Sequence, residues 1–171
     1  MGDKLMSFRS NLEKLEKDLW TNGAVSFKPL KTLDDLIYVT YDCQLTDEQK
    51  DMIEPAWFSI GRAYLFREDN FPCVIRNRND ESIGFINLKK WLSNLPEDTY
   101  SWSYFIDKDQ QGKGYGKKAA QLAIRILKAA NPDMRIKLAT EKANTKAQAL
   151  YRSLGFHQLP ELDGDDLVFG L

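Results

Sequence analysis

Cysteine and histidine are scarce in this chain: its 171 residues include two cysteines, Cys43 and Cys73, and a single histidine, His157. Two cysteines form at most one disulfide, so we expect two reduced thiols in a reducing compartment. One histidine and two well-separated cysteines supply no ligand set for zinc. The scarcity therefore argues against a disulfide-stapled secreted domain, and no metal is expected.

Long apolar runs and an excess of charge of one sign are also missing. No segment approaches the roughly 20 apolar residues that span a bilayer, and the first residues lack the apolar core of a secretory signal. The formal net charge is −1, whereas a nucleic-acid-binding domain usually carries a basic stripe. We therefore expect a cytoplasmic protein with no membrane and no nucleic acid among its partners.

The composition itself is that of an ordinary globular domain, with 43% hydrophobic and 29% charged residues. A chain of this length suits a single domain, and no repeat or linker divides it. We expect the domain proper over residues 23–171 and an N-terminal helical extension over residues 1–22, with an amphipathic helix from Met6 to Trp20. The sequence leaves three places open for that helix: packed on the domain, in a homodimer interface, or loose on the surface.

One stretch, residues 105–118, combines a strand end, a glycine-rich turn and the start of a helix. Its alternating glycines are Gly112, Gly114 and Gly116, and its lysines are Lys113, Lys117 and Lys118. Glycines let the backbone approach a ligand closely. A helix that begins directly after such a turn directs free N–H groups and its positive dipole end at the turn. The stretch therefore predicts an anion site, most naturally for phosphate.

Two common phosphate-binding loops do not fit this spacing. A nucleotide P-loop requires Ser or Thr after its Gly-Lys pair, and here Lys118 follows Lys117. The dinucleotide fingerprint reads G-x-G-x-x-G, whereas this chain reads G-x-G-x-G, and no carboxylate ends a second strand about twenty residues further on. Both are excluded.

The spacing does resemble the acyl-CoA signature Q/R-x-x-G-x-G/A of the GNAT superfamily of N-acetyltransferases, which Gln111, Gly114 and Gly116 match. A second stretch, residues 144–156, is similar to that superfamily's N-x-x-A-x-x-L-Y-x-x-L-G-F helix. The interval between the two stretches holds one helix and one strand, as that fold requires. The pair of motifs implies an acetyltransferase fold with acetyl-CoA as cosubstrate.

Hydrophobic periodicity and turn residues predict an element order that agrees with the resemblance. The expected class is α/β (α+β), a single acetyltransferase domain with a mixed, mostly antiparallel sheet of about seven strands flanked by helices, in the order β-αα-βββ-α-β-α-ββ. The expected strands are 25–30, 71–76, 82–88, 100–106, 135–140, 156–159 and 167–171. The expected helices are 33–43, 46–52, 55–64, 119–130 and 144–154.

The resemblance also implies a site. The central strand and the next one would diverge, and the pantetheine arm of acetyl-CoA would lie in the gap against backbone groups of Tyr104, Phe105 and Ile106, one N–H polarising the thioester carbonyl. The pyrophosphate would bind at Gln111, Gly112, Lys113, Gly114, Tyr115, Gly116 and Lys117. Tyr151 would give a proton to the departing CoA thiolate, and Asn144 would touch the pantetheine.

A plainer role stays open for each of these groups. The glycine turn could be an ordinary connection between a strand and a helix. Tyr151 could simply pack on an amphipathic helix, and Asn144 could act only as the cap of that helix.

The general base is left open, because the central strand offers only serines and aromatic residues. Glu97, Asp98, Glu141 or a chain of waters could serve, and His157 fits a structural or surface role better. Acidic residues gather in two segments: Asp42, Asp47, Glu48, Asp51 and Glu54, then Asp163, Asp165 and Asp166. Such clusters are usually solvated surface, but they could also attract a cationic amine.

We expect an N-acetyltransferase that moves acetyl from acetyl-CoA to a primary amine, a polyamine or another small amine, by direct attack in a ternary complex. Residues 44–85 and the turn 161–164 resemble bacterial polyamine (spermine/spermidine) acetyltransferases. Two alternatives stay open: a catalytically silent acyl-CoA-binding regulatory module, and a protein N-acetyltransferase. A homodimer is a further possibility.

Overall fold

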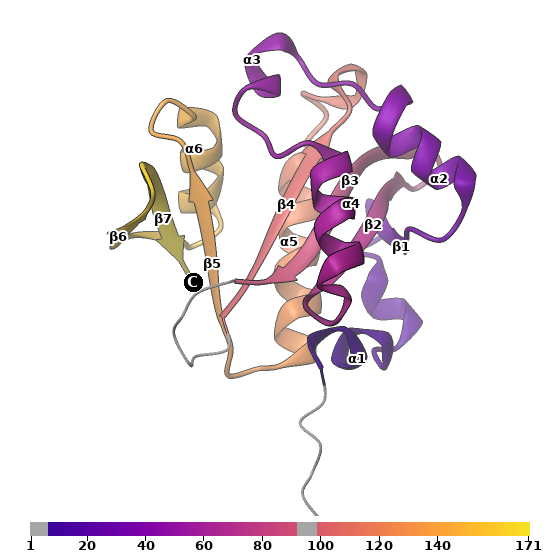
Figure 1. The fold of residues 1–171 in the computed structure, drawn as a ribbon, viewed down its shortest axis with the longest axis horizontal. Helices are drawn as coiled ribbons and strands as arrows, with labels where there is room; N and C mark the ends of the chain where they lie inside the picture. Colours follow the sequence, from indigo (N-terminus) through magenta and orange to yellow (C-terminus); the bar gives the residue numbers. More distant parts are fainter. Residues whose placement is uncertain (1–6, 92–98) are drawn as a thin grey trace, which may run out of the picture.

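The computed structural model describes residues 7–91 and 99–171 and shows one seven-stranded sheet with helices on both faces (Figure 1). The strand order is β1-β2-β3-β4-β5-β7-β6. Neighbouring strands are antiparallel except β4 and β5, which are parallel. The predicted fold class, a mixed and mostly antiparallel sheet flanked by helices, is confirmed.

The predicted elements recur with shifts of a few residues at their ends. The strands are β1 Val25–Pro29, β2 Asn70–Asn77, β3 Ser82–Lys90, β4 Thr99–Ile106, β5 Arg135–Thr140, β6 His157–Asp163 and β7 Asp166–Gly170. The helices are α1 Phe8–Glu13, α2 Leu33–Ile37, α3 Asp47–Lys50, α4 Ala56–Leu65, α5 Tyr115–Ala130 and α6 Thr145–Ser153. A π-helical turn, Tyr38–Asp42, continues α2. The short α3 lies inside the helix predicted over residues 46–52.

The N-terminal segment differs from the prediction of one helix over residues 6–20. Helix α1 ends at Glu13, and a separate 3₁₀ turn, Lys17–Trp20, follows. No glycine or proline marks the break, so packing overrides helix propensity here. Phe8 and Leu12 are buried in the main core, and the Trp20 ring lies 5.3 Å from the Phe71 ring. From Ser7 onward, this segment packs on the sheet and α5.

The main core lies between the sheet and α5. Helix α5 buries one face made of Ala119, Ala120, Leu122, Ala123, Ile126 and Leu127, against strand residues such as Ile86, Ile136 and Phe169. A smaller cluster on the opposite face joins Val39, Cys43, Ala56, Val74, Phe85 and Phe105 under α2 and α4. The small cluster lies next to the residues that form the site described below.

Both cysteines are buried and free. Burial raises the pKa of the Cys43 thiol to about 12, so this thiol stays protonated and unreactive at neutral pH. Within the described part of the chain, no helix is both long enough and apolar enough to cross a membrane. The cytoplasmic location stays a prediction.

Candidate active site

The sheet is split between β4 and β5. These strands pair only at their starts, Thr99 with Arg135 and Tyr100 with Ile136. Beyond that point, β4 continues to pair with β3 and β5 continues to pair with β7, while β4 and β5 move apart (Figure 1). Their facing edges therefore carry backbone groups without strand partners, which an extended ligand can pair with.

A cleft of about 1170 Å³ follows this split. It is larger than the roughly 300–1,000 Å³ of a pocket for a drug-sized ligand. The predicted site residues that line it are Tyr104, Phe105, Ile106, Gln111, Gly112, Gly114, Tyr115, Gly116, Asn144 and Tyr151. Segments far apart in sequence thus meet around one cavity, as the two motifs indicated.

Two predicted residues, Lys113 and Lys117, are exposed and do not line the cleft. The Lys113 Nζ donates instead to the Asp109 carbonyl (3.2 Å) and to Gln110 Oε1 (2.9 Å). A role of these two lysines in coenzyme binding stays a prediction. The positive character of the turn rests first on its backbone.

The glycine-rich turn leaves a group of backbone N–H donors free. Gly112 and Gly114 have φ angles of +76° and +82°, the left-handed region that favours glycine. Gly114 is the N-cap of α5, and no side chain caps this end. Among the described residues, no acceptor binds the amides of residues 112–117. These amides and the dipole of a 16-residue helix are suited to hold an anion.

Gly116 differs from the other two glycines. Its φ is not positive, and an added Cβ would lie 3.6 Å from the Tyr104 hydroxyl, an ordinary contact. That hydroxyl donates to the Gly116 carbonyl at 3.3 Å. Of the three glycines in this turn, Gly112 and Gly114 are therefore the two whose backbone conformation favours glycine.

The Gln111 side chain braces the turn. Its Nε2 donates to the Ile106 carbonyl (2.9 Å) and to Gln49 Oε1 (2.8 Å). Gln49 Oε1 also accepts from the Thr46 N–H at 3.3 Å in the capping box of α3. One glutamine thus joins the end of β4 to α3, which lies 62 residues earlier in the chain.

Tyr151, on α6, is buried against two aromatic rings, with centroids 5.9 Å from Phe156 and 5.6 Å from Phe169. Burial raises the pKa of its phenol to about 12, so the hydroxyl carries its proton at neutral pH. Burial accounts for this shift in pKa, with no hydrogen bond or neighbouring charge contributing. A protonated phenol that faces a cleft can act as a general acid.

Asn144 caps α6, as predicted: its Oδ1 accepts from the Ala147 N–H at 3.1 Å. The loop before the cap is fixed by Gln148, whose Nε2 donates to the Lys142 carbonyl at 2.9 Å. Asn144 also lines the cleft. Its contact with pantetheine stays a prediction, because capping alone accounts for its geometry.

A polar group on the α4 side of the cleft was not found from the sequence. Lys89, on β3, donates from Nζ to Ser103 Oγ on β4 at 2.6 Å. Glu54 lies 3.9 Å from that Nζ and 3.5 Å from Arg62. Burial lowers the pKa of Lys89, although Glu54 opposes the shift. The signal available in the sequence is the alternation Phe85, Asn87, Lys89, which places the lysine on the same face of the strand as a large apolar residue.

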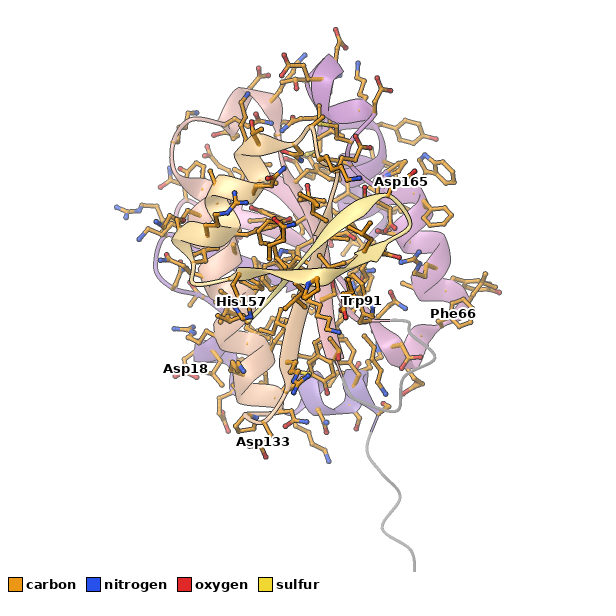
Figure 2. All side chains as sticks on the ribbon, turned by 90° about the vertical axis from the view of Figure 1, so that its left-hand side faces the viewer. Asp18, Phe66, Trp91, Asp133, His157 and Asp165 are labelled. Atoms are coloured by element: carbon orange, nitrogen blue, oxygen red, sulfur yellow. The ribbon has the colours of Figure 1, made fainter. Side chains whose placement is uncertain are left out.

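Of the candidate bases named from the sequence, Glu141 does not line the cleft. Glu141 is exposed and borders a separate hollow beside Asp165, while Glu97 and Asp98 lie outside the described residues. His157 is exposed at the start of β6, at the opposite end of the β6–β7 hairpin from Asp165 (Figure 2). In residues 7–91 and 99–171, no group of three His, Cys, Asp or Glu could hold a metal ion.

The two acidic segments converge on the cleft. Its acidic lining residues are Asp47, Glu48, Glu54, Asp163 and Asp166. Asp42, Asp51 and Asp165 do not line it. Burial, and then Asp163 and Asp165, raise the pKa of the Asp166 carboxyl, so a nearby cation would relieve unfavourable charge.

A split sheet, a turn with free backbone amides and a protonated phenol thus line one cleft, which suits a transferase that uses an acyl-CoA. The model of the acetyltransferase (GNAT) family matches residues 32–156. The chain belongs to this family, and it is an acetyl-CoA-dependent acetyltransferase. No curated protein sequence gives a significant match.

Solved structures share the fold. A protein of Vibrio cholerae described as a ribosomal-protein-serine acetyltransferase superposes with a TM-score of 0.65 at 16% identity, over 89% of this chain and 95% of that one. The aminoglycoside acetyltransferase AAC(6')-Ib in complex with coenzyme A gives 0.66 at 18% identity, over 86% and 94%. Mycobacterium smegmatis RimJ in complex with CoA-disulfide gives 0.55 at 18% identity, over 85% and 68%.

Proposed function

We propose that this acetyltransferase transfers acetyl from acetyl-CoA to the nitrogen of a small primary amine, of which polyamines are the leading class, by direct attack in a ternary complex. The observation that carries the proposal is one continuous cleft that joins free backbone amides, a split sheet and the Tyr151 hydroxyl. Each part suits one portion of the reacting pair.

The cofactor end is the turn and the split. The amides of residues 112–117 would hold the pyrophosphate, because they are unpaired and lie at a helix N-terminus. The pantetheine arm would run along β4, where backbone groups of residues 104–106 face the gap. One of their N–H groups would polarise the thioester carbonyl as negative charge develops on its oxygen.

The chemical step needs an acid for the leaving group. Tyr151 would give its phenolic proton to the departing CoA thiolate, since its raised pKa keeps it protonated until the sulfur needs a proton. The plainer role, a tyrosine that only packs against Phe156 and Phe169, predicts no effect of removing the hydroxyl.

The acceptor end carries acidic groups from two distant segments. Glu48 and Glu54 come from the α3–α4 side, and Asp163 and Asp166 come from the β6–β7 hairpin. Their convergence favours a cationic acceptor by electrostatic attraction. A polyamine suits this arrangement because it presents a second cationic group beside the amine that reacts.

A thermal-shift and turnover experiment tests the proposal. We expect acetyl-CoA to raise the melting temperature, because binding to the native state stabilises it. Release of free CoA thiol is then measured with spermidine, a monoamine, an aminoglycoside and a peptide with a free N-terminus. Turnover fastest with spermidine supports the polyamine class, and turnover only with the peptide replaces it with a protein acceptor. Acetyl-CoA binding without turnover of any amine points instead to a silent acyl-CoA-binding module.

A further inference from the structure

Lys89 occupies a position in the cleft that no motif assigns. It lies near the end of β3, where it pairs with Ser101 of β4. Its Nζ reaches along β4 to Ser103 Oγ at 2.6 Å. Lys89, Ser103 and Tyr151 all line the same cleft. The Lys89 ammonium group therefore lies beside β4, the strand that borders the split. The Ser103 hydroxyl can connect it to an acceptor bound in the cleft.

Lys89 is held in place by neighbouring side chains, but the carboxylate beside it is shared with other groups. Its side chain is only 15% exposed, and Glu54 Oε2 lies 3.9 Å from Nζ. Glu54 is shared: Arg62 approaches its carboxylate at 3.5 Å, and the Ser59 hydroxyl donates to it. The carboxylate is thus partly neutralised before it acts on Lys89.

The charged groups that face Lys89 come from three elements. Glu54 precedes α4, Arg62 lies on α4, and Asp163 ends β6. The two carboxylates favour the charged lysine, and Arg62 and burial disfavour it. Burial is the largest influence, so the pKa of Lys89 lies below that of an ordinary lysine. A larger fraction of Lys89 is therefore neutral at physiological pH.

We propose that Lys89, through the Ser103 hydroxyl, accepts the proton that the acceptor ammonium must lose before its nitrogen attacks. The inference rests on the proposed function and supplies the base that the sequence left open. The ammonium donates to Ser103 Oγ, whose own proton passes to the neutral Nζ at hydrogen-bond distance. Glu54 acts as a positioning residue for Lys89.

The protons and bonds balance in this scheme. Of the three ammonium protons, the first passes through Ser103 to Lys89. The free amine attacks the thioester carbon, so that a C–N bond forms and the C–S bond breaks. Tyr151 gives its proton to the CoA sulfur and regains one from the new nitrogen. The third proton stays on the amide, and Lys89 returns its proton to water.

Four variants test the assignment: Lys89→Arg, Lys89→Met, Ser103→Ala and, as control, Lys137→Arg. Lys137 is a matched residue, since its side chain is 11% exposed and contacts Glu161 at 2.7 Å outside the cleft. Lys89→Arg keeps the positive charge but cannot lose its proton. We expect kcat to fall about 100-fold at pH 7 in Lys89→Arg and Lys89→Met. The KM for acetyl-CoA and the melting temperature should stay near wild type in Lys89→Arg.

The pH profile separates proton transfer from a structural role. As pH rises towards the pKa of the acceptor amine, the amine needs no base, so the deficit of the Lys89 variants should shrink towards wild type. Ser103→Ala should show the same closing deficit. A deficit that is constant across pH, or full activity in Lys89→Arg, overturns the proposal.

A measurement without turnover keeps this inference separate from the proposed function. Competitive labelling of the holoprotein with trace acetic anhydride across a pH series, read by peptide mass spectrometry, gives the titration of each lysine. We expect Lys89 to become reactive at lower pH than an ordinary lysine. If Lys89 titrates as an ordinary lysine does, the inference fails even when the enzyme is active. If no amine turns over while Lys89 titrates low, the proposed function fails instead.

Discussion

The two faces of the sheet differ in how many hydrophobic residues they bury and in how many polar groups they carry. Among the described residues, the face towards α5 packs 25 buried hydrophobic residues into one cluster, whereas the α2–α4 face packs 6. The smaller face also carries polar residues, such as Asn87 and Lys89. Helix α4 exposes large apolar side chains, Trp57 at 67% and Tyr64 at 84%, and Phe66, just after α4, projects outward (Figure 2).

This contrast separates stability from chemistry. Apolar burial on the α5 face supplies the main favourable free energy of folding and fixes the turn at the start of α5. Polar groups cost free energy to bury, so their concentration at one cleft marks a site rather than a scaffold. Changes to the scaffold should alter stability and spare function, and changes to the cleft should do the reverse.

The largest effect is expected from Gly114→Glu. The change places a carboxylate where backbone amides gather for an anion, at a φ of +82°, so acetyl-CoA binding should be abolished. Calorimetric titration of acetyl-CoA measures the loss. Gly23→Glu is the matched control, with a φ of +80° and, as at Gly114, no atom within 4 Å of an added Cβ. Both variants should lose similar stability, and unchanged coenzyme affinity in Gly114→Glu would refute the phosphate site.

Tyr151→Phe should come next, with kcat lowered about 10³-fold. The change removes the proposed proton donor but keeps the ring between Phe156 and Phe169, so acetyl-CoA affinity and melting temperature should change little. Steady-state kinetics with the best amine of the panel measure the effect. Tyr64→Phe, at an exposed position outside the cleft, is the control. A wild-type kcat in Tyr151→Phe would leave the tyrosine with packing alone.

Leu12→Ala probes the scaffold. Leu12 is fully buried in the α5-side core, so its truncation should cost about 3 kcal/mol of unfolding free energy through lost burial and a cavity. Urea unfolding measures this cost, and acetyl-CoA affinity at low temperature should be unchanged. Leu65→Ala, at a side chain that is 72% exposed, should be nearly neutral. Equal costs for the two would break the contrast between the faces.

The smallest effect is expected from Asp166→Asn, at the acceptor end. Removing this charge should raise the KM for a cationic amine about 5-fold, by less at high salt. The free energy of unfolding should not fall with this loss of substrate affinity. Because the folded pKa of Asp166 is raised, the ionised carboxylate opposes folding at neutral pH, and this penalty disappears as pH falls below the unfolded pKa. The variant should therefore be at least as stable as wild type at pH 7.

Asp80→Asn, at a hairpin outside the cleft, is the control for this charge removal. Its KM for the amine should equal that of wild type. An amine KM that is insensitive to Asp166→Asn would remove the electrostatic support for a cationic acceptor.

Local patterns predicted the elements that local chemistry decides. Hydrophobic alternation predicted the strands, and Asn144 predicted the start of α6. Both signals, a strand period and a helix N-cap, are contained within a few consecutive residues. The break after α1 was not predictable, since no breaker residue stands there and the burial of Phe8 and Leu12 decides it. The position of Tyr151 in the cleft was predicted because Tyr151 belongs to the motif recognised over residues 144–156.

The polar contacts around Lys89 could not be predicted from the sequence, because they depend on strand register. Lys89 meets Ser103 only because β3 and β4 pair with Lys89 opposite Ser101. The bond between Gln111 and Gln49 likewise joins segments 62 residues apart. Such contacts follow from the assembled sheet, and no short window of sequence contains them.

The early parting of β4 and β5 also bears on what the open strand edges can bind. Unpaired strand edges usually lie at the rim of a sheet, where they can recruit another chain. Here two such edges face each other inside the protein, flanked by α6 and the α3–α4 segment. A slender extended molecule can enter between them, while a folded neighbour is too bulky to do so. The unpaired edges of β4 and β5 are thus accessible to a narrow, extended ligand and not to another folded chain.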